Sequence, residues 1–157
     1  MRNIHKTLIR PTLDYCISVW KPYTKKDKEK LEKIQRRYTK MIIGCKGKTY
    51  EQRLNKLRLT SLEQRHYRAD MIQVFKVLKD QKNIYPADFL TLSKRSGRKN
   101  SMKLYKKRCG LDVSKHCFTS RVVDQWNILP DKVILATDVN EFKSRLDHHM
   151  RSVRGQK

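Results

Sequence analysis

The stretch Thr24–Ile43, with the sequence TKKDKEKLEKIQRRYTKMII, predicts the clearest helix of this chain. Thr24 followed three residues later by Asp27 is typical of a helix start, because the threonine side chain accepts a hydrogen bond from a free N–H of the first turn. Gly44 and Gly47 follow the segment and favour its end there. Apolar residues recur at spacings of three and four, which predicts one inward-facing stripe. Its members are Leu31, Ile34, Tyr38, Met41 and Ile42.

The opposite face of the same helix is basic. Lys33, Arg36, Arg37 and Lys40 recur at the same spacing. Lysine and arginine that neutralise phosphates release counterions, which gives affinity for nucleic acid without sequence preference. The alternative interpretation is an ordinary solvated helix face, and the acids of this helix offset only its first half.

Further helices are predicted on both sides of this one. Pro11 interrupts an N-terminal helical segment and either kinks it or begins a new helix. Thr49 with Gln52 opens a short helix, and Ser61 opens the longest of the later ones, whose apolar stripe is Tyr67, Met71, Val74, Phe75 and Leu78. Asp138 with Glu141 caps the last helix. The fold class is therefore mostly α: a small bundle of about six helices with a short basic loop or hairpin insertion. The predicted ranges besides 24–43 are 3–20, 49–57, 62–80, 118–129 and the segment after Asp138, with one more helical turn at 86–90.

The insertion holds no acid between Asp88 and Asp112. Alternating apolar and basic residues over Met102–Tyr105 indicate a strand, and Leu111–Val113 is a candidate second strand of a hairpin. The stretch is interpreted as a nuclear-localisation patch or an arm on nucleic acid, with a disordered linker as the alternative. The predicted parts of the chain are a helical domain over 1–92, the basic loop or hairpin over 93–117, a C-terminal helical pair over 118–150 and a tail over 151–157.

The charge of the whole chain points to a polyanionic partner. The 157 residues carry 38 Lys and Arg against 15 Asp and Glu, a formal net charge of +23. A compact domain repels itself at that charge unless a polyanion neutralises it, so nucleic acid is the expected partner, ahead of a membrane or an acidic protein. The predicted binding residues are Lys33, Arg36, Arg37, Lys40, Arg65, Arg68, Lys94, Arg95, Arg98, Lys99, Lys106, Lys107 and Arg108. Tyr23, Tyr50, Tyr67 and Tyr105 could stack on bases, a place in the core or at its rim being the alternative for each of them.

The compartment is expected to be nuclear or cytoplasmic. No apolar run approaches the ~20 residues that span a bilayer. No secretory signal is visible, and the four cysteines form no paired motif, which favours reduced thiols.

Chemistry of the chain's own has little support in the sequence. Asp131, Glu141 and Lys143 mimic the carboxylate–carboxylate–lysine pattern of one nuclease class, but the latter two fall in a predicted helix rather than a strand. Cys109, His116 and Cys117 supply zinc-ligand types without the spacing of a zinc finger. No catalytic residue, metal site or cofactor is therefore predicted.

Several blocks, taken in order, resemble one family. The resemblance is to the C-terminal part, the thumb and the region downstream of it, of the reverse transcriptase protein of jockey-like non-LTR (LINE-type) retrotransposons. It covers nearly the whole chain, roughly residues 8–147. The blocks are LIRPxLxYxxxVW at 8–20, LEKIQRRxTKMI at 31–42, YExRLxxLxLxSLExR at 50–65, DMIxVFK at 70–76, RVVxxWNxLP at 121–130 and NxFKxxLD at 140–147.

The resemblance implies a thumb-like domain over 1–92 that holds a template–primer duplex by its backbone. The parent family is an RNA-directed DNA polymerase, whose paired catalytic aspartates lie upstream of the region that this sequence matches. The expectation is therefore a fragment that binds an RNA–DNA hybrid or another duplex without polymerase activity of its own. The upstream polymerase core is a second expected partner. The alternative is a retroelement-derived protein-docking module with no independent nucleic-acid role.

Overall fold

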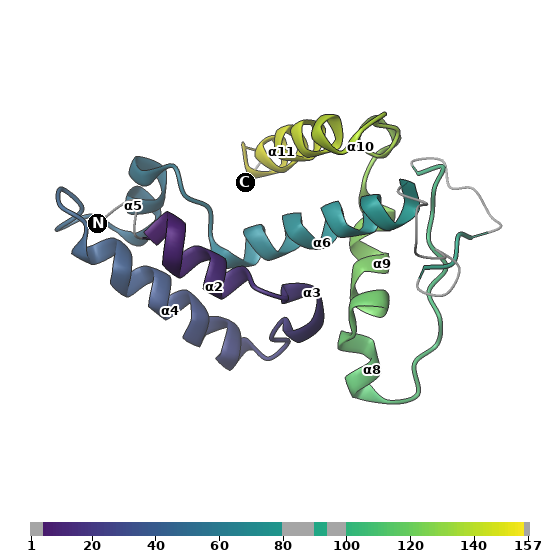
Figure 1. Cartoon of the computed structure of the whole chain (residues 1–157), viewed down its shortest axis with the longest axis horizontal. Helices are drawn as coiled ribbons and strands as arrows, with labels where there is room; N and C mark the ends of the chain where they lie inside the picture. The colour runs from purple at the N-terminus through teal and green to yellow at the C-terminus, as the bar shows by residue number, and fades with distance from the viewer. Residues whose placement is uncertain (1–4, 80–89, 94–99, 156–157) are drawn as a thin grey trace. The chain divides into compact units, whose positions relative to one another are not determined.

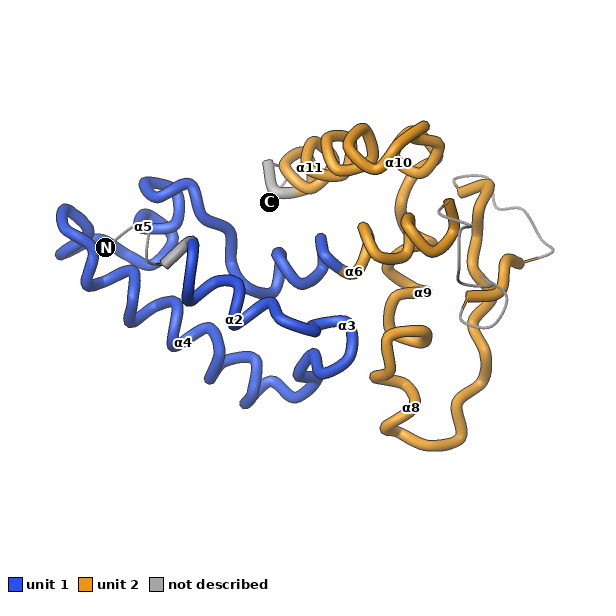
Figure 2. The backbone as a smooth tube through the Cα atoms, viewed as in Figure 1, with its two compact units in different colours: residues 1–69 blue, residues 70–157 orange. Residues whose placement is uncertain are grey.

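The computed structural model of the chain describes residues 5–79, 90–93 and 100–155 (Figure 1). The fold is mostly α, as the sequence predicts: the described residues form nine α-helices, one π-helical turn and an isolated β-bridge. Two compact units, residues 1–69 and 70–157, meet within helix α6 (Figure 2). Of the predicted helical turn at 86–90 only residue 90 is described, and residues 94–99 of the basic insertion fall outside the described residues.

The first unit begins with three short helical elements. The π-helical turn η1 covers His5–Ile9, and α2 covers Arg10–Asp14 with Pro11 in its first turn. Of the two predicted alternatives, the structure has a new helix that begins at Arg10 with Pro11 in its first turn, where the fixed φ of proline suits the helix. Helix α3, Ile17–Trp20, is separated from α2 by Tyr15 and Cys16, and Cys16 has a left-handed φ of 48°.

Helix α4, Lys25–Met41, confirms the predicted central helix and its cap. The backbone N–H of Asp27 donates to Thr24 Oγ1 at 3.1 Å. After the helix, Gly44 and Gly47 have φ values of 79° and 74°, which glycine adopts without steric cost.

The predicted inward face of α4 is partly wrong. Ile34 and Met41 are 47% and 57% exposed, whereas Gln35 and Thr39 are fully buried. The helix is rotated because both buried polar side chains find hydrogen-bond partners: Gln35 at Tyr50 and Thr60, and Thr39 at Arg53 and the Arg36 carbonyl. The Nε2 group of Gln35 and the hydroxyl of Thr39 have their bonds made, although Gln35 Oε1 is buried with no partner among the described residues, so apolar spacing alone does not decide the face.

Helix α5, Tyr50–Leu57, packs beside α4. The predicted start at Thr49 is confirmed as a reciprocal capping box with Gln52. A small apolar cluster fills the space under the end of α4 and along α5; it consists of Ile42, Cys45, Leu54, Leu57 and Leu59.

Helix α6, Leu62–Lys79, begins in the first unit and continues into the second. Its apolar stripe in the second unit is buried as predicted, at Met71, Val74, Phe75 and Leu78. Phe75 stacks on Phe142 with ring centroids 4.3 Å apart, and Trp126 lies 6.0 Å from the same Phe142 ring. These three aromatic rings form the centre of the second core.

Four more helices complete the second unit: α8 (Asp112–His116), α9 (Phe118–Ile128), α10 (Asp131–Ile134) and α11 (Val139–Gly155). The predicted strand at Leu111–Val113 is wrong, since α8 begins at Asp112. An acid in the first turn and Lys115 with His116 in the last turn match the helix dipole and favour that helix. The first predicted strand instead pairs through Leu104 with Leu92, in an antiparallel bridge.

Candidate nucleic-acid interface

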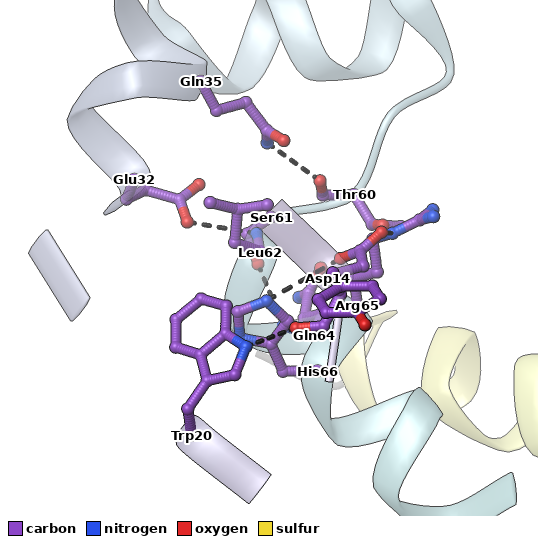
Figure 3. A network of polar contacts seen from close by, with 11 residues as sticks. Asp14, Trp20, Glu32, Gln35, Thr60, Ser61, Leu62, Gln64, Arg65 and His66 are labelled. Carbon is purple, nitrogen blue, oxygen red and sulfur yellow. Dashed lines mark hydrogen bonds and ion pairs between the residues drawn. The ribbon is translucent and has the colours of Figure 1, made fainter. Parts of the chain in front are cut away.

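A network of polar contacts fixes which face of α4 points outward (Figure 3). Gln35 Nε2 donates to the Thr60 carbonyl at 3.0 Å and to the Tyr50 hydroxyl at 2.9 Å. Glu32 accepts from the backbone N–H of Leu62 at 3.0 Å and from the Tyr50 hydroxyl. Because these contacts hold one side of α4 against α5 and the start of α6, the helix cannot rotate without breaking them.

The side of α4 opposite this network is exposed and mostly basic, with one acid, Glu29, among its positive charges. Lys33, Arg37 and Lys40 all lie there. At 100° per residue, Lys26 and Lys30 fall on the same side, and both are exposed. The sequence reasoning missed these two lysines, although the same spacing of three and four would have found them.

The basic face suits contact with a phosphate backbone. From Lys26 to Lys40 it runs for about 21 Å at ~1.5 Å per residue. Within the described residues no carboxylate pairs with Lys33, Arg37 or Lys40. Lys30 pairs with Asp27 at 3.1 Å, an exposed contact of the kind that competes weakly with a phosphate.

Arg36 lies at the flank of this face rather than at its centre. Its guanidinium lies 5.0 Å from the centroid of the Tyr50 ring, and the buried Arg53 lies 5.6 Å from the same centroid. Burial of the phenol, then its hydrogen bond to Glu32, raises the pKa of Tyr50. The phenol therefore stays protonated and neutral, and it remains a donor to the carboxylate.

Arg65 and Arg68, on α6, are half-buried, whereas the basic residues of the α4 face are exposed. The guanidinium of Arg65 forms an ion pair with Asp14 (Figure 3). His66 Nε2 lies 3.7 Å from the other oxygen of that carboxylate. Burial, and then the neighbouring charge of Arg65, lower the pKa of Arg10. Arg65 thus holds α2 to α6 within the first unit, a contact between residues 51 positions apart that the sequence did not indicate.

The other predicted nucleic-acid-binding residues either belong to the second unit or lie outside the residues that the structure describes. Lys106, Lys107 and Arg108 are exposed there, and Lys106 pairs with Asp124. The structure thus brings the predicted residues of α4 together in one unit and the triplet 106–108 together in the other. Lys94, Arg95, Arg98 and Lys99 lie outside the described residues.

The two carboxylates of the alternative nuclease pattern, Asp131 and Glu141, accept hydrogen bonds from neighbouring residues of the fold. Asp131 Oδ1 accepts from the backbone N–H of Ser101 at 2.7 Å and from its hydroxyl at 2.8 Å, and these bonds lower the pKa of Asp131. Glu141 accepts from the N–H and the hydroxyl of Thr137, which likewise lower its pKa. Over 5–79, 90–93 and 100–155, no three His, Cys, Asp or Glu residues gather in a group that could hold a metal ion.

Comparisons with protein-family models, with curated proteins and with solved structures found no match to this chain. In the part of the chain that the structure describes, no helix has the length and apolar character needed to cross a bilayer.

Proposed function

We propose that this chain binds nucleic acid through the basic face of α4, which contacts phosphates and reads no sequence. The observation that carries the proposal is the fixed rotation of α4: Glu32 and Gln35 are held inward, so Lys33, Arg37 and Lys40 point to solvent together. Phosphate contacts of this kind set affinity and orientation but do not distinguish bases. The net charge of +23 supports a polyanionic partner.

The resemblance to jockey-like retrotransposon reverse transcriptases extends this proposal. We infer that the chain is a C-terminal fragment of such an RNA-directed DNA polymerase, without the catalytic palm and without polymerase activity alone. Its nucleic acid is then an RNA–DNA hybrid or another duplex in the nucleus or cytoplasm. The α4 segment at 31–42 is also one of the blocks that carry the resemblance.

Fluorescence anisotropy across a salt series tests the proposal. The full chain is titrated onto a labelled RNA–DNA hybrid, a DNA duplex and a single strand, as wild type and as Lys33→Gln with Arg37→Gln. Each lost phosphate contact lowers the slope of log affinity against log salt by ~0.9 on duplex DNA, so the double variant is expected to lose about 1.8. The double variant should lose the same factor of affinity for two duplexes of unrelated sequence.

The matched control is Lys46→Gln with Lys48→Gln, which removes two exposed positive charges from the same unit but not from α4. It should leave the slope nearly unchanged. Equal losses in the two double variants would mean that the charge of the chain is not organised into a site, and would overturn the proposal.

A second candidate function, docking on another protein, is favoured by the exposed apolar residues of the same region. Ile34 and Met41 of α4 are about half exposed, and Ile43 just after it is 92% exposed. In the retroelement interpretation the partner is the polymerase core. This alternative predicts that Ile34→Gln with Met41→Gln raises the concentration at which the chain aggregates, measured by light scattering. If that variant instead weakens duplex binding, the apolar residues belong to the nucleic-acid face.

A further inference from the structure

A segment of the second unit, residues 100–105, is attached to α9 by side chains: it begins with a turn at Ser101 and Met102 and is paired at Leu104. Trp126 Nε1 donates to the Met102 carbonyl at 2.8 Å, and Asn100 Nδ2 donates to the Trp126 carbonyl at 2.9 Å. Asn127 bonds both backbone groups of Leu104: its Oδ1 accepts from the N–H at 2.8 Å, and its Nδ2 donates to the carbonyl at 3.0 Å. The amide of Asn127 thus acts as a neighbouring strand would.

The other side of the same segment is bonded as well. The N–H of Tyr105 donates to the Thr91 carbonyl, and the N–H of Ser93 donates to the Lys103 carbonyl, both at 2.7 Å. The backbone at 103–105 is therefore held from two sides, which fixes the directions of its side chains.

Those directions place an aromatic ring between lysines. Side chains alternate in an extended chain, and Leu104 is buried, so its two neighbours point away from α9. Tyr105 is 56% exposed, and Lys103 and Lys107, two positions to either side of it, are exposed. Lys106 differs, because its ammonium group pairs with Asp124 of α9.

We propose that Tyr105, with Lys103 and Lys107, forms a stacking site for an unpaired base of single-stranded nucleic acid. A base that is stacked within a duplex offers no free face, whereas a single strand lays its bases on aromatic rings while lysines neutralise the adjacent phosphates. Because the backbone at 103–105 is already held by hydrogen bonds, binding a base requires ordering of side chains only, which lowers the entropic cost. This site lies in the other unit from the α4 face and does not rest on the duplex-binding proposal.

The test uses DNA and RNA oligonucleotides that carry one 2-aminopurine, a base whose fluorescence is quenched by stacking. Wild type and Tyr105→Phe should quench the emission, because both keep the ring. Tyr105→Leu should abolish the quenching and weaken single-strand affinity about tenfold, within the range of stacking losses on ring removal. Duplex affinity should stay unchanged in all three proteins.

Two lysine variants provide a matched comparison. Lys107→Gln should weaken single-strand binding more than Lys106→Gln, since the latter lysine is already paired with a carboxylate. Circular dichroism melting confirms that each variant is folded, and Tyr105→Phe controls for any loss of packing. Quenching that persists in Tyr105→Leu, or that disappears equally in Tyr105→Phe, would overturn the stacking site. The salt slope of the α4 variants on duplex is measured separately, so failure of one proposal is distinguishable from failure of the other.

Discussion

The carboxylate of Glu32 accepts a hydrogen bond from the backbone N–H of Leu62, the first residue of α6, at 3.0 Å. N–H groups of a first helical turn have no partner within the helix and are usually satisfied by a nearby side chain. Here a residue 30 positions earlier, on another helix, supplies the acceptor. One carboxylate thus joins the start of α6 to the middle of α4.

Glu32→Gln should therefore destabilise the protein. An amide has one acceptor oxygen where the carboxylate uses two, so either the Leu62 N–H or the Tyr50 hydroxyl loses its acceptor. We expect a loss of about 1–3 kcal/mol in the free energy of unfolding, measured with urea. Glu29→Gln removes the same charge from an exposed position of the same helix and is the control. Equal effects would show that charge, and not the bridging contacts, sets the stability.

Arg121→Gln should be the more damaging of two arginine substitutions in the second unit. Its guanidinium donates to both carboxylate oxygens of Asp70, at 3.1 and 3.4 Å, and the Asp70 side chain is fully buried. The substitution takes two charge-assisted hydrogen bonds away from a buried carboxylate, at a cost of about 3–5 kcal/mol. Arg145→Gln, which breaks a more exposed pair with Glu141, should change the melting temperature little. A similar loss in both variants would contradict this ranking.

Substitutions of Arg37 and Arg65 should have different effects, the first on duplex affinity and the second on the melting temperature. Arg37→Gln should lower duplex affinity and leave the melting temperature nearly unchanged, because the side chain is exposed on the α4 face. Arg65→Gln should lower the melting temperature, because it leaves the partly buried Asp14 carboxylate without its guanidinium. Anisotropy and thermal melting on the same two proteins check both outcomes, and the reverse pattern would reassign the interface to α6.

The pKa of Asp131 should depend on Ser101. Both hydrogen bonds from Ser101 favour the charged carboxylate, so the folded pKa lies below the ordinary aspartate value of 3.8. The stabilisation from this group is complete above pH 3.8 and is lost as pH falls through the lower folded value. Ser101→Ala keeps the backbone donor and removes the hydroxyl. A carbon-detected NMR titration should show the Asp131 pKa moving up toward 3.8, and an unchanged pKa would contradict the assignment.

Local patterns in the sequence predicted most of the helices. The caps at Thr24, Thr49 and Asp138 act within three residues, and the structure confirms each of them. The apolar stripe of α6 is confirmed for the same reason, because one helical period determines it. Residues near in sequence are sufficient for such features.

Contacts between distant residues account for what the sequence did not predict. The rotation of α4 depends on Gln35 reaching Tyr50 and Thr60, which no spacing rule anticipates. Leu104 pairs with Leu92 instead of forming a hairpin with Leu111–Val113, and its other edge is bonded by the amide of Asn127, a residue 23 positions away. For the candidate site, the exposed α4 lysines were readable from helical spacing, whereas the pairing of Arg65 with Asp14 was not. Binding itself stays a prediction.

The double attachment of residues 103–105 also bears on aggregation. An extended segment with a free edge is a template on which a second chain can add a strand. On one edge, the Asn127 amide bonds the backbone groups of Leu104. On the other edge, Ser93 and Thr91 bond the backbone of Lys103 and Tyr105. Loss of the Asn127 amide would open that edge at Leu104, so this single asparagine protects the segment against strand-by-strand association between copies of the chain.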